Sequence, residues 1–424
     1  MRGGPIPIPP SDLRVSDLAG RAVGVWGAGR EAVAALHALR IHAPGSTAIV
    51  VTSDAPPADA PPLPYSDVPW LHGDEGLAAL AACDVVIRSA GVPVRSAEAD
   101  RVRLGPSHPA RPVLTTGTAL WFAERVDRET VIGVTGTKGK STISSLIHHL
   151  LGRAGVRSRL VGNIGRPLLD ELDPSDPPDA WVVELSSYQL SDLPRSPTIA
   201  VVTNLLRDHL PWHGDEQTYH DDKLRILTAE AATEGRHNPR MAILSHADPS
   251  LRVAAETLDA PVLWVDDPQG IHVAEGEIRN GSRPLCRIAD LPLRGVIGAR
   301  NVCAALEAVH ALGYEIPDIA DALRDFVPLP HRQQVLGSHD GRTWVDDSIS
   351  TTPEAALAAV AAFAPGPVVL IAGGDHRDQE YTSLARALAS GEIPTGAFGE
   401  PPVSVDIAGL VTLPGTGPEI AAAV

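Results

Sequence analysis

The chain has 424 residues, and its 35 Lys and Arg residues against 52 Asp and Glu residues give a formal net charge of −17. This length predicts two or three domains, and the acidic balance excludes general binding to nucleic acid or to anionic membrane surfaces. The three cysteines lie far apart, which indicates a reducing compartment and predicts neither a disulfide framework nor a zinc cluster. The chain has no apolar signal core and no apolar run of membrane-spanning length, so we expect a cytoplasmic protein without membrane insertion.

Short apolar, β-branched runs alternate with Ala- and Leu-rich segments of helical length. Examples are RAVGVWG followed by REAVAALHALR, and TVIGVTG followed by KSTISSLIHHLLGRAG. This alternation is typical of parallel sheets covered by helices on both faces, so the predicted fold class is α/β. Punctuation by Pro and Gly divides the chain into three predicted domains, residues 1–112, 113–328 and 329–424.

The first predicted domain carries a glycine-rich turn between a strand and a helix. The segment from Gly27 through Gly29 to Ala32 reads G-x-G-x-x-A, and Asp54 follows the next strand. This arrangement lets backbone N–H groups approach a diphosphate at a helix N-terminus, with an acidic residue available for a ribose or a base. Glycines at such a turn also serve packing alone, so the spacing by itself leaves both readings open.

The second predicted domain opens with GVTGTKGKST, residues 133–142, between a strand and a helix. Gly136 and Gly139 allow the backbone to curl around a phosphate, Lys140 can reach the terminal phosphates, and Ser141 can ligate magnesium. Val134 stands where the common phosphate loop has its first glycine. The segment predicts a nucleotide site, and the alternative is an ordinary turn with a surface lysine.

Polar side chains follow the next strands of the same domain. Glu184 ends the apolar run AWVVE, where a carboxylate is costly unless it meets a cation. His209 and His213 follow a later strand, and Lys223 lies on a predicted helix beyond them. Glu184 suits a magnesium ligand, although a carboxylate that emerges into solvent at a strand end and histidines on the surface remain alternatives.

Several motifs in order resemble the Mur ligases of peptidoglycan precursor synthesis. They are GVTGTKGKST, GNIG, VVELSSYQL, NLLRDHL, YHDDKLRIL, GARNVCAA, LPHR and VDDS. The family carries a shortened loop T-G-T-x-G-K-S/T, which accounts for Val134. The resemblance implies Rossmann-like domains at both ends and a central P-loop ATPase-like domain with a mainly parallel sheet. VELSSYQL and PHRQQV look most like the branch that adds glutamate.

The resemblance implies a role for each position that matches a family motif. Expected to bind ATP are Gly136, Thr137, Lys138, Gly139, Lys140, Ser141, Thr142, Asn301, Arg332 and Asp346. Expected to bind the UDP-sugar are Gly27, Gly29, Asp54, Ser89, Gly91 and Asn163. Expected to hold two magnesium ions are Ser141, Glu184, His209 and a carbamylated Lys223. Lys140, Lys223 and His209 would act in catalysis, and Ser348 with Arg377 would bind glutamate.

The implied activity is ATP-dependent formation of an amide bond between UDP-N-acetylmuramoyl-L-alanine and glutamate through an acyl phosphate. We expect a monomer. The alternatives are a Mur-ligase-like nucleotide binder without catalysis and a ligase of the folate-polyglutamate type, although the latter lacks a separate UDP-binding domain at its start.

Several positions depart from the family pattern, in the magnesium-site segment and at the amino-acid end. Ile349 replaces a lysine after Asp347 and Ser348, Arg207 replaces an acidic residue before Asp208, and DDSISTTP resembles a variant that adds L-glutamate and relies on a separate epimerase. The chain ends at GPEIAAAV, so we expect an incomplete third domain.

Overall fold

The structure is a computed structural model, and it describes residues 11–55, 64–104, 112–231, 235–375, 379–395 and 401–424. Contacts group the chain into two compact units. Unit 1 takes the chain up to residue 140 with 155–244 and 250–263, and unit 2 takes 141–154, 245–249 and 264–424. The bounds of the three domains predicted from the sequence stay predictions.

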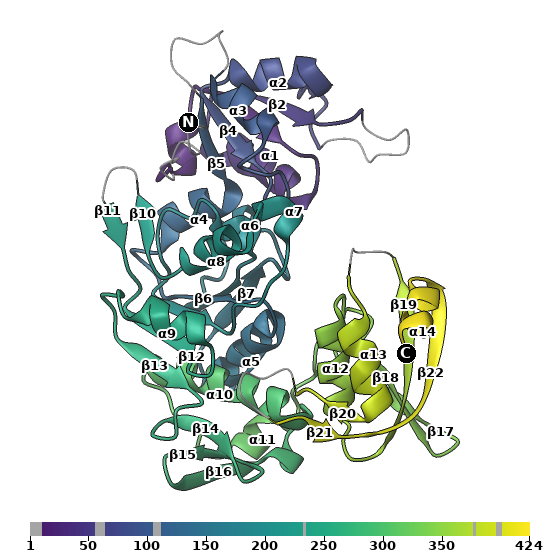
Figure 1. The fold of residues 1–424 in the computed structure, drawn as a ribbon. Coiled ribbons are helices and arrows are strands. Elements are labelled where there is room, and N and C mark those ends of the chain that lie inside the picture. The colour runs from purple at the N-terminus through teal and green to yellow at the C-terminus, as the bar shows by residue number, and fades with distance from the viewer. Residues whose placement is uncertain (1–10, 56–63, 105–111, 232–234, 376–378, 396–400) are drawn as a thin grey trace. The chain divides into compact units, whose positions relative to one another are not determined.

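The first sheet of unit 1 has five strands in the order β3-β2-β1-β4-β5, and all its registered pairs are parallel. The strands are β1 (Ala22–Trp26), β2 (Thr47–Thr52), β3 (Trp70–His72), β4 (Val85–Arg88) and β5 (Val113–Thr116). The helices between them are α1 (Arg30–His42), α2 (Gly73–Ala81) and α3 (Ala97–Leu104) (Figure 1). This order confirms a Rossmann-like first domain, and the strand order reverses between β1 and β4.

The second sheet has six strands in the order β13-β12-β9-β6-β8-β7. They are β6 (Val131–Thr135), β7 (Ser158–Gly162), β8 (Ala180–Glu184), β9 (Ile199–Val202), β12 (Met241–Ser245) and β13 (Val262–Val265). The pairings around β6 and β8 are parallel, and every residue of β6, β8 and β9 is buried. Continuous apolar runs therefore form central strands of a parallel sheet, as predicted.

Among the described residues, five α-helices lie between β5 and β12, and predicted site residues lie on the second and the fifth of them. They are α4 (Gly117–Arg125), α5 (Lys140–Arg153), α6 (Ser187–Leu190), α7 (Leu210–His213) and α8 (Glu216–Leu224). In α5, Ile143, Leu146, Ile147 and Leu150 recur at helical spacing and are buried. The helix therefore begins directly after the glycine-rich loop, because its apolar stripe begins there.

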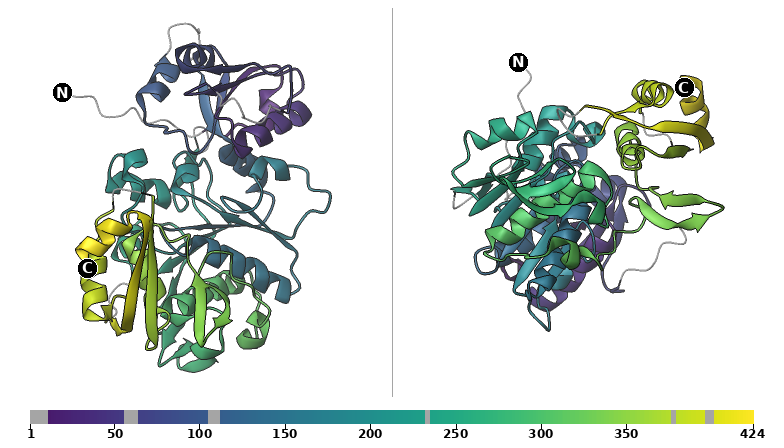
Figure 2. Two further views of the ribbon diagram at one scale, coloured as in Figure 1. Left: turned by 90° about the vertical axis from the view of Figure 1, so that its right-hand side faces the viewer. Right: turned by 90° about the horizontal axis from the view of Figure 1, so that it is seen from below.

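Unit 2 contains a long helix, a small antiparallel sheet and a parallel strand pair. The helix is α10 (Gly295–Ala311), and the sheet is β14 (Ile271–Ala274), β15 (Glu277–Asn280) and β16 (Arg283–Arg287). β17 (Gln334–His339) and β18 (Arg342–Asp346) form a hairpin. β19 (Pro367–Gly374) and β22 (Asp406–Gly415) pair in parallel and share a core with α12 (Pro353–Ala361), α13 (Thr382–Ser390) and α14 (Gly417–Ala423) (Figure 2). The parallel pair with its helices fits the predicted α/β class.

The other described elements are short. They are η1 (Val15–Leu18), η2 (Leu168–Glu171), β10 (Ala229–Ala231), β11 (Gly235–His237), α9 (Pro249–Ala255), η3 (Ile288–Asp290), α11 (Ile319–Leu323), β20 (Glu392–Ile393) and β21 (Val403–Ser404). Among the described residues, no helix combines the length and the apolar character needed to cross a membrane.

Candidate active site

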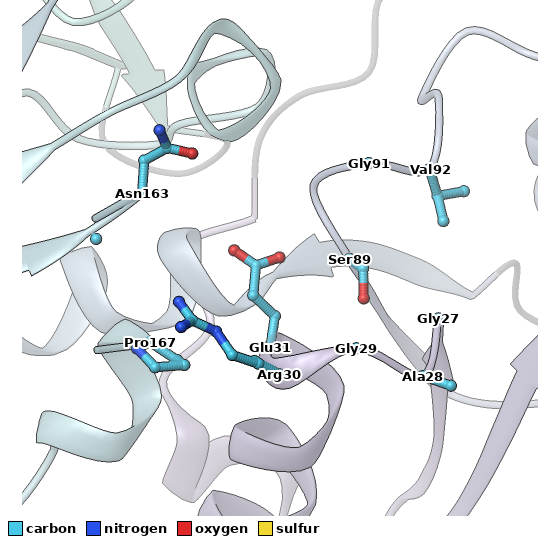
Figure 3. A pocket seen from close by; sticks show the side chains of 11 residues that line it. Gly27, Ala28, Gly29, Arg30, Glu31, Ser89, Gly91, Val92, Asn163 and Pro167 are labelled. Carbon is cyan, nitrogen blue, oxygen red and sulfur yellow. The ribbon is translucent and has the colours of Figure 1, made fainter. Parts of the chain in front are cut away.

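A pocket of about 410 Å³ lies in unit 1 at the carboxyl ends of β1 and β4 (Figure 3). Its lining residues are Gly27, Ala28, Gly29, Arg30, Glu31, Ser89, Gly91, Val92, Gly162, Asn163 and Pro167. The pocket therefore occupies the point where the strand order reverses, which is where open parallel sheets bind their ligands. The segment after β7 completes it.

Five of the six residues predicted to bind a UDP-sugar line this pocket. They are Gly27, Gly29, Ser89, Gly91 and Asn163. Gly27 has a φ of 120°, and a Cβ atom there would lie 2.3 Å from the Ser89 hydroxyl oxygen, so the close approach of the two turns requires glycine. Asp54 is exposed beyond β2 and is not among the lining residues, so its role stays a prediction.

The sequence patterns missed the two charged side chains of the pocket. The Ala90 N–H donates to Glu31 Oε2 at 3.0 Å, which ties the start of α1 to the turn after β4. Arg30 Nη2 donates to the Gly165 carbonyl at 3.2 Å. Both residues were visible within G-x-G-x-x-A, but the pattern treats the two positions between the second glycine and the alanine as free.

The loop between β6 and α5 is curled as its glycines predict. Gly136 has a φ of 143° and Gly139 a φ of 87°. A Cβ atom on Gly136 would lie 1.8 Å from Thr203 Oγ1, so another residue does not fit without moving the loop. Lys140 opens the helix, and its ammonium donates to the Thr137 carbonyl at 2.9 Å.

The residues after β9 fasten this loop. Thr203 Oγ1 donates to the Lys138 carbonyl at 2.6 Å, and the Lys138 N–H donates to Asn204 Oδ1 at 2.9 Å. The Thr137 N–H donates to the Asn204 carbonyl at 2.9 Å, and the Thr137 hydroxyl donates to the Leu206 carbonyl at 3.0 Å. Both polar groups of Thr137 are thus bonded within the protein, so this residue shapes the loop whatever it contributes to ATP.

Glu184 is buried at the end of β8, with 1% of its surface exposed. The Asn163 amide donates to its Oε1 at 2.8 Å, whereas its Oε2 has no hydrogen-bond partner. An unsatisfied buried carboxylate oxygen is costly and attracts a cation. The carboxylate therefore fits the predicted magnesium ligand.

Lys223 lies on α8 with 1% of its surface exposed, and its ammonium donates to the Gly136 carbonyl at 2.7 Å. Burial holds its pKa well below the usual range, and the charge of Lys140 acts in the same direction. Burial therefore favours the neutral amine at this position, and carbon dioxide carbamylates only a neutral amine.

His209 precedes α7 in a left-handed conformation with a φ of 54°. Its Nδ1 lies 3.0 Å from the Tyr188 hydroxyl, and burial lowers its pKa, which favours the neutral imidazole that ligates metals. The neighbouring Asp208 carboxylate lies 3.7 Å from the Lys138 ammonium. Lys138, predicted as an ATP contact, therefore has an acidic partner within unit 1.

Among the described residues, no group of three His, Cys, Asp or Glu side chains has the geometry of a metal site. The predicted magnesium ligands include only two residues of these types, Glu184 and His209, besides Ser141 and Lys223. The fit to magnesium therefore rests on the unpartnered Glu184 oxygen.

A buried relay that the sequence patterns did not single out runs beside Lys223. His213 Nε2 lies 3.0 Å from the Ser187 hydroxyl, and its Nδ1 lies 2.8 Å from Asp222 Oδ2. The two terminal nitrogens of Arg95 each donate to one Asp222 carboxylate oxygen at 2.8 Å. His213 therefore serves as a satisfied core residue rather than a ligand.

The remaining predicted residues lie in unit 2. Arg332 Nη2 donates to the Ser141 hydroxyl at 3.0 Å, which brings together two predicted ATP contacts. The Ser348 N–H and His331 both bond to Asp346, and they lower its pKa to about 2, so it is an anion at neutral pH. Thr142 lies in the first turn of α5 and Asn301 on α10. Arg377 lies outside the described residues.

Comparison with known proteins identifies the family of this chain. The model of the Mur ligase middle domain matches residues 134–309. A curated relative, the UDP-N-acetylmuramoyl-L-alanine--L-glutamate ligase of Xanthomonas axonopodis pv. citri (strain 306), is 42% identical over 384 residues, which are 89% of this chain and 79% of the relative.

Solved structures show the same fold at low identity. The UDP-N-acetylmuramate-alanine ligase MurC from Thermotoga maritima aligns with a TM-score of 0.53 at 16% identity, over 95% of this chain and 88% of its own. The MurF ligase from Thermotoga maritima in complex with ADP aligns with a TM-score of 0.51 at 16% identity, over 94% and 92%. With the curated relative and the matched domain, these findings establish that the chain belongs to the Mur ligase family of ATP-dependent, amide-bond-forming ligases.

Proposed function

We propose that the protein joins L-glutamate to UDP-N-acetylmuramoyl-L-alanine with hydrolysis of ATP to ADP, in peptidoglycan precursor synthesis. One observation carries the site assignment. Asn163 lines the pocket at the ends of β1 and β4 and donates to Glu184 at 2.8 Å, so the sugar pocket borders the predicted metal ligand. A substrate whose uridine diphosphate fills the pocket has its acid end available to the nucleotide loop.

The residues of the site prepare a carboxylate for phosphorylation. The substrate carboxylate attacks the γ-phosphate of ATP, and ADP leaves as the acyl phosphate forms. Two anions must approach each other, so positive charge from Lys140 and N–H groups at the start of α5 lower the barrier. The amine of glutamate then attacks the acyl carbon, loses a proton, and displaces phosphate as the amide bond forms.

We propose that magnesium is held by Ser141, Glu184, His209 and carbamylated Lys223, in two sites. Bound magnesium supplies further positive charge that offsets the phosphate oxygens. The Lys223 amine, favoured in its neutral form by burial, would add carbon dioxide and release a proton, which converts a neutral amine into an anionic oxygen ligand. Lys140 nearby balances the new negative charge.

The choice of L-glutamate rests on two observations. The curated relative at 42% identity is named for L-glutamate. The segment DDSISTTP departs from the usual pattern next to Ser348, where Ile349 replaces a positive charge. We propose that the third domain, with Ser348 and Arg377, binds this amino acid, that a separate epimerase acts on the product, and that the ligase works in the cytoplasm as a monomer.

A paired assay tests the function. Phosphate release is measured with UDP-N-acetylmuramoyl-L-alanine, ATP and magnesium, and with either L- or D-glutamate. We expect release with the L isomer and little with the D isomer. Preference for D-glutamate would overturn the stereochemical assignment alone. No phosphate release with either isomer would favour a nucleotide-binding protein without catalysis. In a further reaction a folate acceptor replaces the UDP-sugar, and phosphate release there would favour the folate-type ligase.

A further inference from the structure

The turn that follows β4 has all four of its carbonyl groups bound by two side chains. Arg88 Nη1 donates to the carbonyls of Ser89 and Ala90 at 3.3 Å each, and to that of Val92. Trp212 Nε1 donates to the Gly91 carbonyl at 3.2 Å. We call residues 89–92 the sugar turn, and Arg88 with Trp212 the clamp. Neither clamp residue lines the pocket, whereas three residues of the sugar turn do (Figure 3).

Arg88 is an unusual residue for the last position of a core strand. Its side chain is fully buried, and a buried guanidinium is costly unless it is paired and hydrogen-bonded. Its Nη2 donates to Asp192 Oδ2 at 3.0 Å and lies 3.4 Å from the Ser191 hydroxyl. These residues directly follow α6, so Arg88 ties the sugar turn to the segment that continues from Glu184.

Trp212 anchors the other side of the turn. Its ring lies 4.7 Å from the Tyr188 ring, and Tyr188 bonds to His209. The Arg88 guanidinium lies 5.9 Å from the Trp212 ring, so the two clamp residues also contact each other. The sugar turn is thus fastened to both segments that carry the predicted metal ligands Glu184 and His209.

The direction of the carbonyl groups matters for an anionic ligand. Carbonyl oxygens carry partial negative charge, and a diphosphate is bound by N–H groups and hydroxyls rather than by carbonyls. Because the four carbonyls of the sugar turn are held by Arg88 and Trp212 outside the pocket, their oxygens are kept from the ligand. The Ser89 hydroxyl and the glycine backbone are left to face it.

We propose that Arg88 and Trp212 are positioning residues that set the affinity for the uridine diphosphate part of the substrate by fixing the sugar turn. The inference rests on the proposed function, since it takes the pocket at β1 and β4 to hold that part. The clamp touches neither ATP nor the reacting carboxylate. Its loss therefore raises the KM for the UDP-sugar and leaves the KM for ATP unchanged.

The test compares Arg88→Lys and Trp212→Phe in the full chain, with UDP as the calorimetric probe and steady-state kinetics beside it. Arg88→Lys keeps the positive charge but loses the planar guanidinium with its several N–H donors. We therefore expect UDP binding to weaken about 10- to 100-fold, as for loss of charge-assisted hydrogen bonds. Trp212→Phe keeps the ring and loses one N–H donor, for which we expect about 3- to 10-fold. Both variants keep kcat within about twofold, since neither removes a group that acts on the transition state.

The control is Arg40→Met, which removes an exposed ion pair with Asp67 from the same sheet domain and leaves UDP affinity unchanged. Unaltered UDP affinity in a folded Arg88→Lys variant overturns the clamp, as does a fall in kcat with intact UDP binding. Where Arg88→Lys does not fold, Trp212→Phe decides on the same readouts. If the parent protein does not bind UDP, both the assigned substrate and the role of the clamp are wrong. If the parent binds UDP and the variants bind it equally well, only the role of the clamp is wrong.

Discussion

Lys140 and Lys223 lie close enough for the charge of one to depress the pKa of the other. Two ammonium groups near one loop repel, and the fully buried member loses its proton more readily. Burial therefore favours Lys223 as the neutral amine that carbamylation needs, whereas Lys140 lies at the start of α5 beside the nucleotide loop. Different burial gives the same side chain two different tasks.

Lys140→Ala is expected to lower kcat by about 100- to 1000-fold, as for removal of an electrostatic stabiliser of a transition state. ATP-dependent phosphate release with both substrates present is the measurement. Arg153→Ala, at the other end of α5 and paired with Asp321 on the surface, is the matched control and should keep full activity. Near-normal turnover of the Lys140 variant would reject its assignment.

Helix α8 directs three side chains into the site from one face. Tyr219, Asp222 and Lys223 are spaced at i, i+3 and i+4, and all three are buried. The Tyr219 hydroxyl lies 2.9 Å from that of Thr137, and Lys223 bonds to Gly136, so the helix supports the nucleotide loop. Asp222 holds the helix in place through Arg95 and His213.

Asp222→Ala removes the shared partner of Arg95 and His213. We expect the free energy of unfolding to fall by about 3 kcal/mol, at the lower end for a broken buried pair because Arg95 is one-third exposed. Urea unfolding followed by circular dichroism measures the change. Asp67→Ala, whose pair with Arg40 is exposed, serves as control and should unfold like the parent. Equal midpoints for the two variants would show that the relay adds no stability.

At the scale of the whole molecule, an acidic protein must bind three anionic substrates. The net charge of −17 repels ATP, a UDP-sugar and glutamate alike, so binding depends on short-range groups inside the Debye length of about 8 Å. Backbone N–H groups, Arg30 in the pocket and Lys140 at the start of α5 are available for this. The pocket at β1 and β4 is lined only by residues of unit 1, so its ligand acts on that unit directly.

UDP is therefore expected to stabilise unit 1. A ligand present at 100 times its Kd adds about 2.7 kcal/mol to the free energy of unfolding of the part that binds it. Scanning calorimetry with and without UDP should show the rise in the transition of unit 1. Gly27→Val, whose Cβ would meet the Ser89 hydroxyl, should lose the rise. If UDP raises the unfolding transition of this variant as much as that of the parent, UDP binds at another site.

The sequence predicted those parts of the site that follow local rules. Gly136 and Gly139 predict a curled loop, and Glu184 is recognisable in the sequence as a charged residue at the end of an apolar strand. The clamp and the relay could not be predicted in this way, because Arg88 meets Asp192 across 104 residues of sequence and Arg95 meets Asp222 across 127. Asp54 does not line the pocket, and its role in binding the UDP-sugar stays a prediction.

The hydrogen bond from Asn163 to Glu184 has a consequence for the order in which ligands act. Asn163 lines the pocket at β1 and β4 and Glu184 is a predicted metal ligand, so a ligand that reorients the amide also changes the electric field at the carboxylate. Thermodynamic linkage makes such an effect mutual. If bound UDP-sugar changes the affinity for the metal by some factor, bound metal changes the affinity for the UDP-sugar by the same factor. The two ligands would then bind cooperatively.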